Sequence, residues 1–245
     1  MLVYQNPTIV QNPLGVPEGL TLSRSAAQQI TIAPGRAVVA RSSGIRQIAT
    51  RTTTLAKNLN ATWAQGNNQG GRASTVALTT STVYHVYLLM DSGGNVDAYF
   101  DTSATAANRP AGWDARMVGS ILTDGSNNIR EFNQIDNRFE YHGTEVIALW
   151  STNLSTASGN VITLPTPSFA SAFGTCYGFA STGTAVIWLG AESDPSPNVG
   201  LFASAQSNDF FWQVNTNRMR IYTTQANVTA IVRVRGFVHP RGSQG

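Results

Sequence analysis

The fold is decided by residues 83–100, VYHVYLLMDSGGNVDAYF. Residues 83–90 are apolar or aromatic apart from His85, and residues 96–100 resume the same pattern. Between them, the sequence SGGN at 92–95 tolerates the positive φ angles that a tight turn requires. Two such runs joined by a glycine-containing turn predict a β-hairpin.

Strand and turn signals continue downstream of this hairpin. Residues 117–122 and 129–132 flank the turn sequence DGSNN at 124–128, which predicts a second hairpin. After residue 160 the same rhythm returns, and residues 231–235 alternate in the way that a sheet with one dry and one wet face requires. The expected C-terminal strands are VITL, CYGFAS, AVIWLGA, VGLFASA, DFFWQV, RMRIYT and VTAIVRVRGFV.

Upstream of the hairpin, apolar residues alternate with polar ones. Ile30 and Ile32 predict a strand, and a turn at Pro34 leads into a second strand at residues 37–40. The threonine run within residues 47–60 fits either a strand or one helical turn, and its three consecutive β-branched residues favour a strand.

Short strands at this spacing predict an all-β chain that contains antiparallel β-sandwich or jelly-roll-like domains. A β-solenoid is not expected, because no period of twenty to fifty residues repeats. We predict a first β domain at residues 21–150, a linker at 151–160 and a C-terminal β-sandwich at 161–245. The linker STNLSTASGN is the longest stretch of low hydrophobicity.

Residues 1–20 predict an extended N-terminal arm, because Pro7, Pro13 and Pro17 block regular structure. The arm has apolar residues with no partner in their own segment, so we expect it to lie on a neighbouring subunit or to dock the protein to its carrier. A disordered tail is the alternative. The docking residues would be Leu2, Val3, Tyr4, Ile9 and Val10.

Composition excludes several classes of function. Only 12% of the 245 residues are charged, the net charge is +3, and one lysine stands beside fifteen dispersed arginines, so no basic patch for nucleic acid is visible. Cys176 is alone, which excludes an intrachain disulfide and predicts a small buried side chain. The start of the chain lacks a signal-peptide pattern and no run of eighteen apolar residues occurs, so we expect cytoplasmic synthesis without membrane insertion.

Residue patterns for catalysis and metal binding are weak. Asp91, Asp97 and Asp101 surround a glycine turn, but their spacing does not match a calcium loop and predicts turn chemistry instead. A glycosidase needs two facing carboxylates, and no pattern selects a pair among the thirteen acidic residues. The three histidines are isolated, and no hydrolase, zincin or phosphate-loop motif occurs. We therefore expect no enzyme activity, no metal and no cofactor.

Aromatic residues gather in the C-terminal half. Exposed rings there could stack on sugar faces, with asparagines bonding the hydroxyls, whereas the alternative is that the rings fill a sandwich core or a subunit interface. The candidate glycan contacts are Trp188, Trp212, Asn215 and Tyr222.

Short sequence motifs follow one another in a fixed order between residues 30 and 141. They include WAQGNNQGG at 63–71, YHVY at 84–87, VDAYFDTS at 96–103, PAGW at 110–113 and GSILTDG at 119–125, and the segment ends at Phe132 and Gln134. This order of motifs resembles a segment of tailed-bacteriophage virion proteins. Trp113 and Met117 depart from the usual pattern, in which a tyrosine and a basic residue are commoner.

This resemblance implies a structural role in the virion and transfers no catalytic residue. The reading that follows is a homotrimeric tail-fibre or baseplate adhesin component, whose partners are other copies of itself and other phage proteins. A capsid head-fibre or decoration protein is the first alternative. A carbohydrate-binding module that recognises bacterial surface polysaccharide is the alternative of another class.

Overall fold

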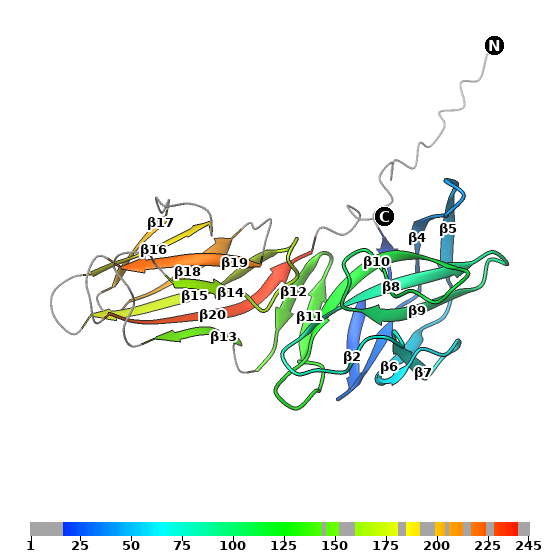
Figure 1. Cartoon of the computed structure of the whole chain (residues 1–245), viewed down its shortest axis with the longest axis horizontal. Helices are drawn as coiled ribbons and strands as arrows, with labels where there is room; N and C mark the ends of the chain where they lie inside the picture. The colour runs from blue at the N-terminus through cyan, green and yellow to red at the C-terminus, as the bar shows by residue number, and fades with distance from the viewer. Residues whose placement is uncertain are drawn as a thin grey trace, which may run out of the picture.

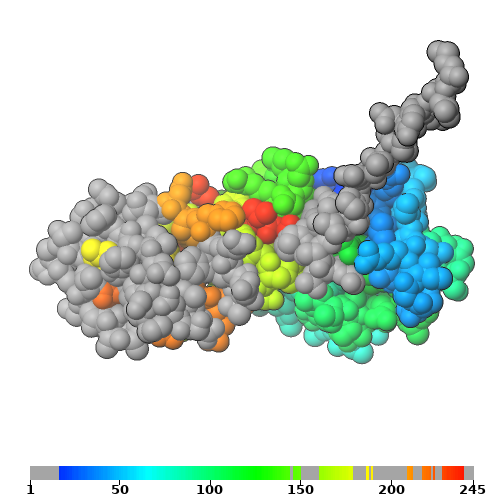
Figure 2. Space-filling model, turned by 90° about the horizontal axis from the view of Figure 1, so that it is seen from above, coloured from blue at the N-terminus to red at the C-terminus, as the bar shows by residue number. Residues whose placement is uncertain are grey.

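The computed structural model describes residues 17–143, 146–151, 160–180, 185–191, 199–203, 206–212, 217–223 and 228–239. In these ranges the chain forms twenty β-strands and no helix, which confirms the all-β prediction. The molecule is elongated, and its two bodies lie side by side along the long axis (Figure 1). Figure 2 shows the same elongated outline from above.

The first body is built on a curled seven-stranded sheet of order β10-β8-β9-β7-β6-β3-β2. Two of its pairings, β6 with β7 and β7 with β9, are parallel, and the others are antiparallel. Its strands are β2 (Leu22–Ala26), β3 (Gln29–Ile32), β6 (Leu55–Thr62), β7 (Gln69–Arg72), β8 (Val83–Asp91), β9 (Val96–Asp101) and β10 (Trp113–Leu122).

A smaller sheet of order β1-β4-β5 covers part of this body. It consists of β1 (Glu18–Gly19), β4 (Gly35–Ala40) and β5 (Arg46–Arg51). Ala37, Val39 and Ala49 point inward and belong to the first core, together with buried residues of β8 and β9 such as Tyr84 and Phe100. The small sheet therefore presents one dry face and one wet face.

The second body is a β-sandwich. One sheet has the order β11-β12-β20-β15-β18, with β13 also pairing β20, and the other has the order β14-β19-β16-β17. The second core lies between these two sheets, and most of its buried residues are aliphatic. The strands are β11 (Phe132–Ile135), β12 (Arg138–Tyr141), β13 (Val146–Ser151), β14 (Asn160–Thr163), β15 (Ser171–Ala180), β16 (Ala185–Ala191), β17 (Val199–Ala203), β18 (Gln206–Trp212), β19 (Arg218–Thr223) and β20 (Val228–Val238).

The last strand joins segments that are distant in the sequence. β20 pairs with β12, β13 and β15, all antiparallel. Residues 132–151, which we predicted in the first domain, thus share a sheet with the C-terminal strand. The predicted linker itself falls largely outside the described residues, as do residues 1–16 of the arm.

Several predicted elements are confirmed. The first hairpin is β8 and β9, with Gly94 at φ +83° in its turn. All seven C-terminal strands form, and in β20 Val232 and Val234 are buried while Arg233 is exposed. Cys176 is buried, and burial raises the pKa of its thiol to about 12.

Three local predictions differ from the structure. The turn after β10 forms, but its pairing stops at one bridge between Thr123 and Ile129, because β11 pairs with β12 instead. The strand predicted within residues 47–60 is confirmed at 47–51 and 55–60, but the threonines at 52–54 connect β5 to β6. β3 and β4 follow each other across Pro34 as predicted, yet they belong to different sheets.

Candidate functional sites

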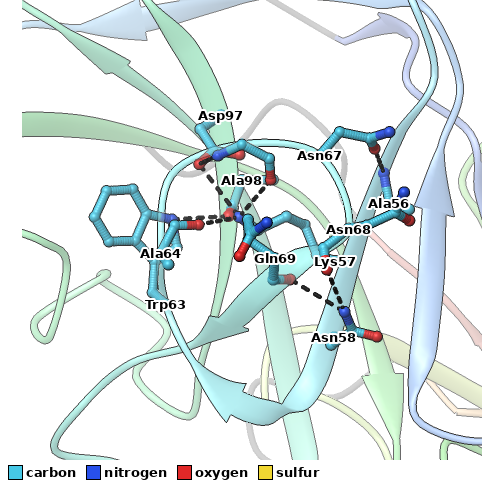
Figure 3. A network of polar contacts seen from close by, with 11 residues as sticks. Ala56, Lys57, Asn58, Trp63, Ala64, Asn67, Asn68, Gln69, Asp97 and Ala98 are labelled. Carbon is cyan, nitrogen blue, oxygen red and sulfur yellow. Dashed lines mark hydrogen bonds and ion pairs between the residues drawn. The ribbon is translucent and has the colours of Figure 1, made fainter.

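The most polar site inside the first body is a buried ion pair between Lys57 on β6 and Asp97 on β9 (Figure 3). The side chain of Lys57 has 0% exposure and its Nζ lies 3.2 Å from Asp97 Oδ2. Nζ also donates to the carbonyl oxygens of Ala64 at 2.7 Å and Gly66 at 3.2 Å, which uses the three donors of an ammonium group. Trp63 lies 5.8 Å from Nζ by its ring centroid.

These contacts hold the loop between β6 and β7. Asn67 Oδ1 accepts a hydrogen bond from Ala56 N at 2.7 Å, and Asn58 Nδ2 donates to Asn68 O at 2.7 Å (Figure 3). Burial lowers the pKa of Lys57, while Asp97 acts in the opposite direction. With its donors all engaged inside the protein, the lysine fixes a loop and does not serve as a nucleophile.

A second carboxylate, Asp101, organises the loop after β9. Its Oδ1 accepts hydrogen bonds from Ser103 N at 3.0 Å and Asn108 Nδ2 at 2.8 Å, and its Oδ2 accepts one from Asn108 N at 3.0 Å. Asp91 in turn accepts hydrogen bonds from the backbone and side chain of Asn95. Turn chemistry thus accounts for the contacts of these carboxylates, and no group of three metal-ligating side chains occurs in the described part of the chain.

His85 and Ser120 form a buried pair on β8 and β10. His85 Nδ1 lies 2.9 Å from Ser120 Oγ, and Asp101 is opposite His85 across the β8–β9 ladder. Serine beside imidazole is the pair used in nucleophilic catalysis, but Ser120 is only 1% exposed, so a substrate does not reach its hydroxyl. Burial lowers the pKa of His85 to about 4, which keeps the ring neutral at pH 7.

One cavity of about 420 Å³ lies near Arg41, Arg109 and Asp114. Arg41 Nε is 3.1 Å from Asp114 Oδ2, and Arg109 Nε donates to Trp113 O at 3.0 Å. Both arginines are therefore engaged within the protein, and they form no open anion-binding fork.

A second cavity, of about 510 Å³, lies where the two bodies meet, and we call it the junction cleft. Its walls come from the start of β8, from β13 and from the segment at residues 163–168, where Pro165 and Pro167 stiffen the backbone. Its polar groups are hydroxyls, an amide and the imidazole of His85, and they include Thr102, Ser168 and Asn217. None of its lining residues is acidic, arginine or lysine.

Hydroxyl groups give the junction cleft much of its polar character. Thr102 and Ser168 are exposed, whereas Thr166 is 1% exposed and its Oγ1 is buried without a hydrogen-bond partner among the residues that the structure describes. A hydroxyl both donates and accepts, so a neutral ligand rich in hydroxyls is the class whose groups match such a lining. The volume is within the range of small-molecule sites. Nothing in the sequence pattern indicated this cleft, because its walls come from distant segments.

The predicted glycan contacts fall on both sheets of the second body. Register places Trp188 on β16 opposite Tyr222 on β19, while Trp212 is on β18 in the other sheet. Asn215 lies outside the described residues, and so do the arm residues Leu2, Val3, Tyr4, Ile9 and Val10. The structure therefore brings two of the four candidates together. On the neighbouring positions of β18, Phe210 is buried and Phe211 is 63% exposed.

The described residues contain no helix of the length and apolarity needed to cross a membrane. No family model, no curated protein and no solved structure matches this chain.

Proposed function

We propose that this chain is a structural protein of a tailed-phage particle that works as a homotrimer, most simply as a tail-fibre or baseplate adhesin component. Its role is structural, through contacts with its own copies and with other particle proteins, and it has no enzyme activity. The particle is its place of action, and other particle proteins are its partners.

One observation carries the proposal: the residues of the phage-like motifs are anchors of the fold. A Cβ on Gly70 would lie 1.9 Å from Thr62 O, and one on Gly71 would lie 2.6 Å from the ring of Phe100. At the end of the segment, Gln134 Oε1 accepts a hydrogen bond from Leu22 N at 2.7 Å. These residues of the phage-like motifs serve packing and backbone hydrogen bonding. Motifs with such roles fit a structural protein better than a reaction centre.

The composition supports an assembly role. With few charges and a single, buried lysine, the surface lacks the mobile charged coat that keeps monomers apart. Symmetric homo-oligomers are the common way for such a chain to cover its remaining apolar surface.

Two measurements test the proposal. Sedimentation of the purified chain at micromolar concentration should give a stable oligomer of about three times 26.2 kDa, and a monomer would overturn the trimer. Antibody labelling of purified particles should mark the tail. Labelling of the head would move the protein to the capsid, and particles without the protein would overturn the virion role.

The junction cleft favours a second function, carbohydrate binding. Its charge-free, hydroxyl-bearing walls suit a neutral sugar better than an acidic one. On an array of bacterial surface glycans, we expect neutral oligosaccharides to bind and acidic ones to fail.

The variant Thr102→Val tests this second function, because it keeps the shape of the side chain and removes the hydroxyl of an exposed residue in the cleft wall. We expect about tenfold weaker sugar binding with no loss of folding stability, since the residue is exposed. Thr50→Val, an exposed threonine on β5, is the matched control. Equal binding by both variants would exclude the junction cleft as the sugar site.

A further inference from the structure

The small sheet exposes apolar residues on its outer face. Ile48 on β5 is 59% exposed, and Ile45, just before the strand, is 61% exposed. Ile48 stands opposite Val38 of β4, which is itself only half-buried. In Figure 1, β4 and β5 project at one end of the molecule, and Figure 2 shows the N-terminal strands, in blue, at the surface there.

β5 is also an edge strand. In the described structure its only ladder partner is β4, so one side of β5 presents unpaired N–H and C=O groups. Natural proteins blunt such edges with prolines, lysines or bulges, because an open edge pairs with other chains. β5 contains no proline, its two charged residues, Arg46 and Arg51, stand at its ends, and its ladder with β4 runs without a register shift. An open edge beside exposed isoleucines is a docking surface.

The chain itself supplies a segment that fits this surface. Residues 1–16 precede β1, which belongs to the same small sheet as β5. These residues contain no charged side chain, and the run TIVQN at 8–12 lies between two prolines. This run is close in length to β5. In an added strand Ile9 and Val10 would point to opposite faces, so that one of them lies on the face of Ile48.

The length of the arm allows it to reach another copy. Sixteen residues in extended conformation span about 50 Å. Pro13 and Pro17 restrict the residues before them to extended conformations, which suits a segment that must span this distance. Contacts in which one surface of a copy meets a different surface of the next form a ring when the rotation between copies closes, as in a trimer, and an open filament when it does not.

We propose that the arm of one copy adds as a strand to the β5 edge of the next copy, with Ile9 and Val10 packed on Ile45 and Ile48. Backbone hydrogen bonds along the edge give affinity, and the apolar side chains set the register. This inference rests on the proposed homo-oligomer and names the interface that holds it together.

The first experiment compares matched arginine variants of the full chain by sedimentation. Ile45→Arg and Ile48→Arg should weaken association at least tenfold, because a charge replaces a buried apolar contact. The control is Ile135→Arg on β11, since Ile135 has the same 61% exposure as Ile45. Circular dichroism checks that all three variants fold.

The second experiment identifies the occupant by disulfide trapping between two full chains that carry different tags. One chain carries Ile9→Cys and the other carries Thr50→Cys, an exposed position on β5. We expect a covalent dimer of unlike tags, and none when Ile135→Cys replaces Thr50→Cys. The native Cys176 is buried and does not interfere.

The outcomes separate this inference from the particle role. If the wild type is an oligomer but the β5 variants associate normally, the interface is wrong while the oligomer stands. A third chain carries both Ile9→Cys and Thr50→Cys. If a disulfide forms within that chain, and none forms between the two singly substituted chains, the arm lies on its own sheet and the proposal is overturned. A monomeric wild type would overturn both.

Discussion

The two bodies of the molecule are stabilised in different ways. The first core has aromatic residues whose hydroxyls bond to loop backbones, as when Tyr84 OH donates to Ala77 O at 2.8 Å and Tyr87 OH donates to Ser103 O. The second core is mainly aliphatic, with residues such as Ile187 and Ile221 between its two sheets. Polar anchors demand particular residues, whereas aliphatic packing accepts many combinations of the same volume.

This difference agrees with the position of the sequence motifs on which the proposed phage resemblance rests. Those motifs lie in the first body and end on β11, at the edge of the second body. A residue such as Asp101, which accepts four hydrogen bonds, is not exchangeable. A valine in a sandwich core can be exchanged for another aliphatic residue of similar volume.

The largest effect should come from the buried ion pair. Lys57→Met leaves the Asp97 carboxylate buried without its cation, and we expect a loss of about 4 kcal/mol in the free energy of unfolding. The comparison is Arg235→Met in the second body, whose pair with Asp209 is exposed and should change stability by less than about 1 kcal/mol. Urea unfolding measures both. Equal losses would contradict the polar-anchor description.

The next effect is a dependence on pH that arises in the first body. The unfolded imidazole of His85 takes up a proton below about pH 6.5, while the folded one does so only near its lowered pKa of about 4. Stability should therefore fall by about 3 kcal/mol as the pH drops from 7 to 4 on account of this residue. His85→Asn should flatten the pH profile in this range. A variant with an unchanged profile would show that His85 is not the titrating group.

A smaller loss is expected when a single anchor is removed. Tyr84→Phe deletes a hydroxyl that bonds to Ala77 O and to Thr79 N, and we expect destabilisation of about 2 kcal/mol. Hydrogen exchange should increase first in the loop at residues 77–82. Protection lost evenly over both bodies would speak against a local anchor.

The smallest effect belongs to the second body. Ile221→Val removes one methylene from an aliphatic core and should cost about 1 kcal/mol. Thermal unfolding measures it against Tyr84→Phe in the same buffer. A loss larger than that of Tyr84→Phe would reverse the ranking of the two bodies.

Local chemistry made the strands predictable. The turn at residues 92–95 needs residues that accept positive φ, and the sequence has them, so β8 and β9 were predictable together. In β20, the alternation of valine and arginine predicted which side chains are buried and which are exposed. Long-range pairing was not predictable, because nothing near β6 indicates that it runs parallel to β7 or that Lys57 meets a carboxylate forty residues later.

The candidate sites were less predictable than the strands. Turn chemistry was predictable for Asp91 and Asp101, since asparagine and glycine around them signal turns, and both accept hydrogen bonds from nearby loop residues. The same prediction was wrong for Asp97, which pairs with the buried Lys57. The junction cleft was missed, because Thr102 and Thr166 meet only through the packing of two bodies. A sequence pattern indicates which residues lie close together within a short segment. It does not indicate the junction cleft, whose walls come from segments that are distant in the sequence.

The position of β20 makes the two cores depend on one strand. Its Phe237 stacks on Phe139 at 4.9 Å and belongs to the first core, while Val232 and Val234 belong to the second. Neither core therefore holds all of its buried residues until β20 is in place. Displacement of β20 would expose the edges of β12 and β15 and apolar faces of both bodies at once, so damage to this one strand presents the whole molecule to chaperones and proteases.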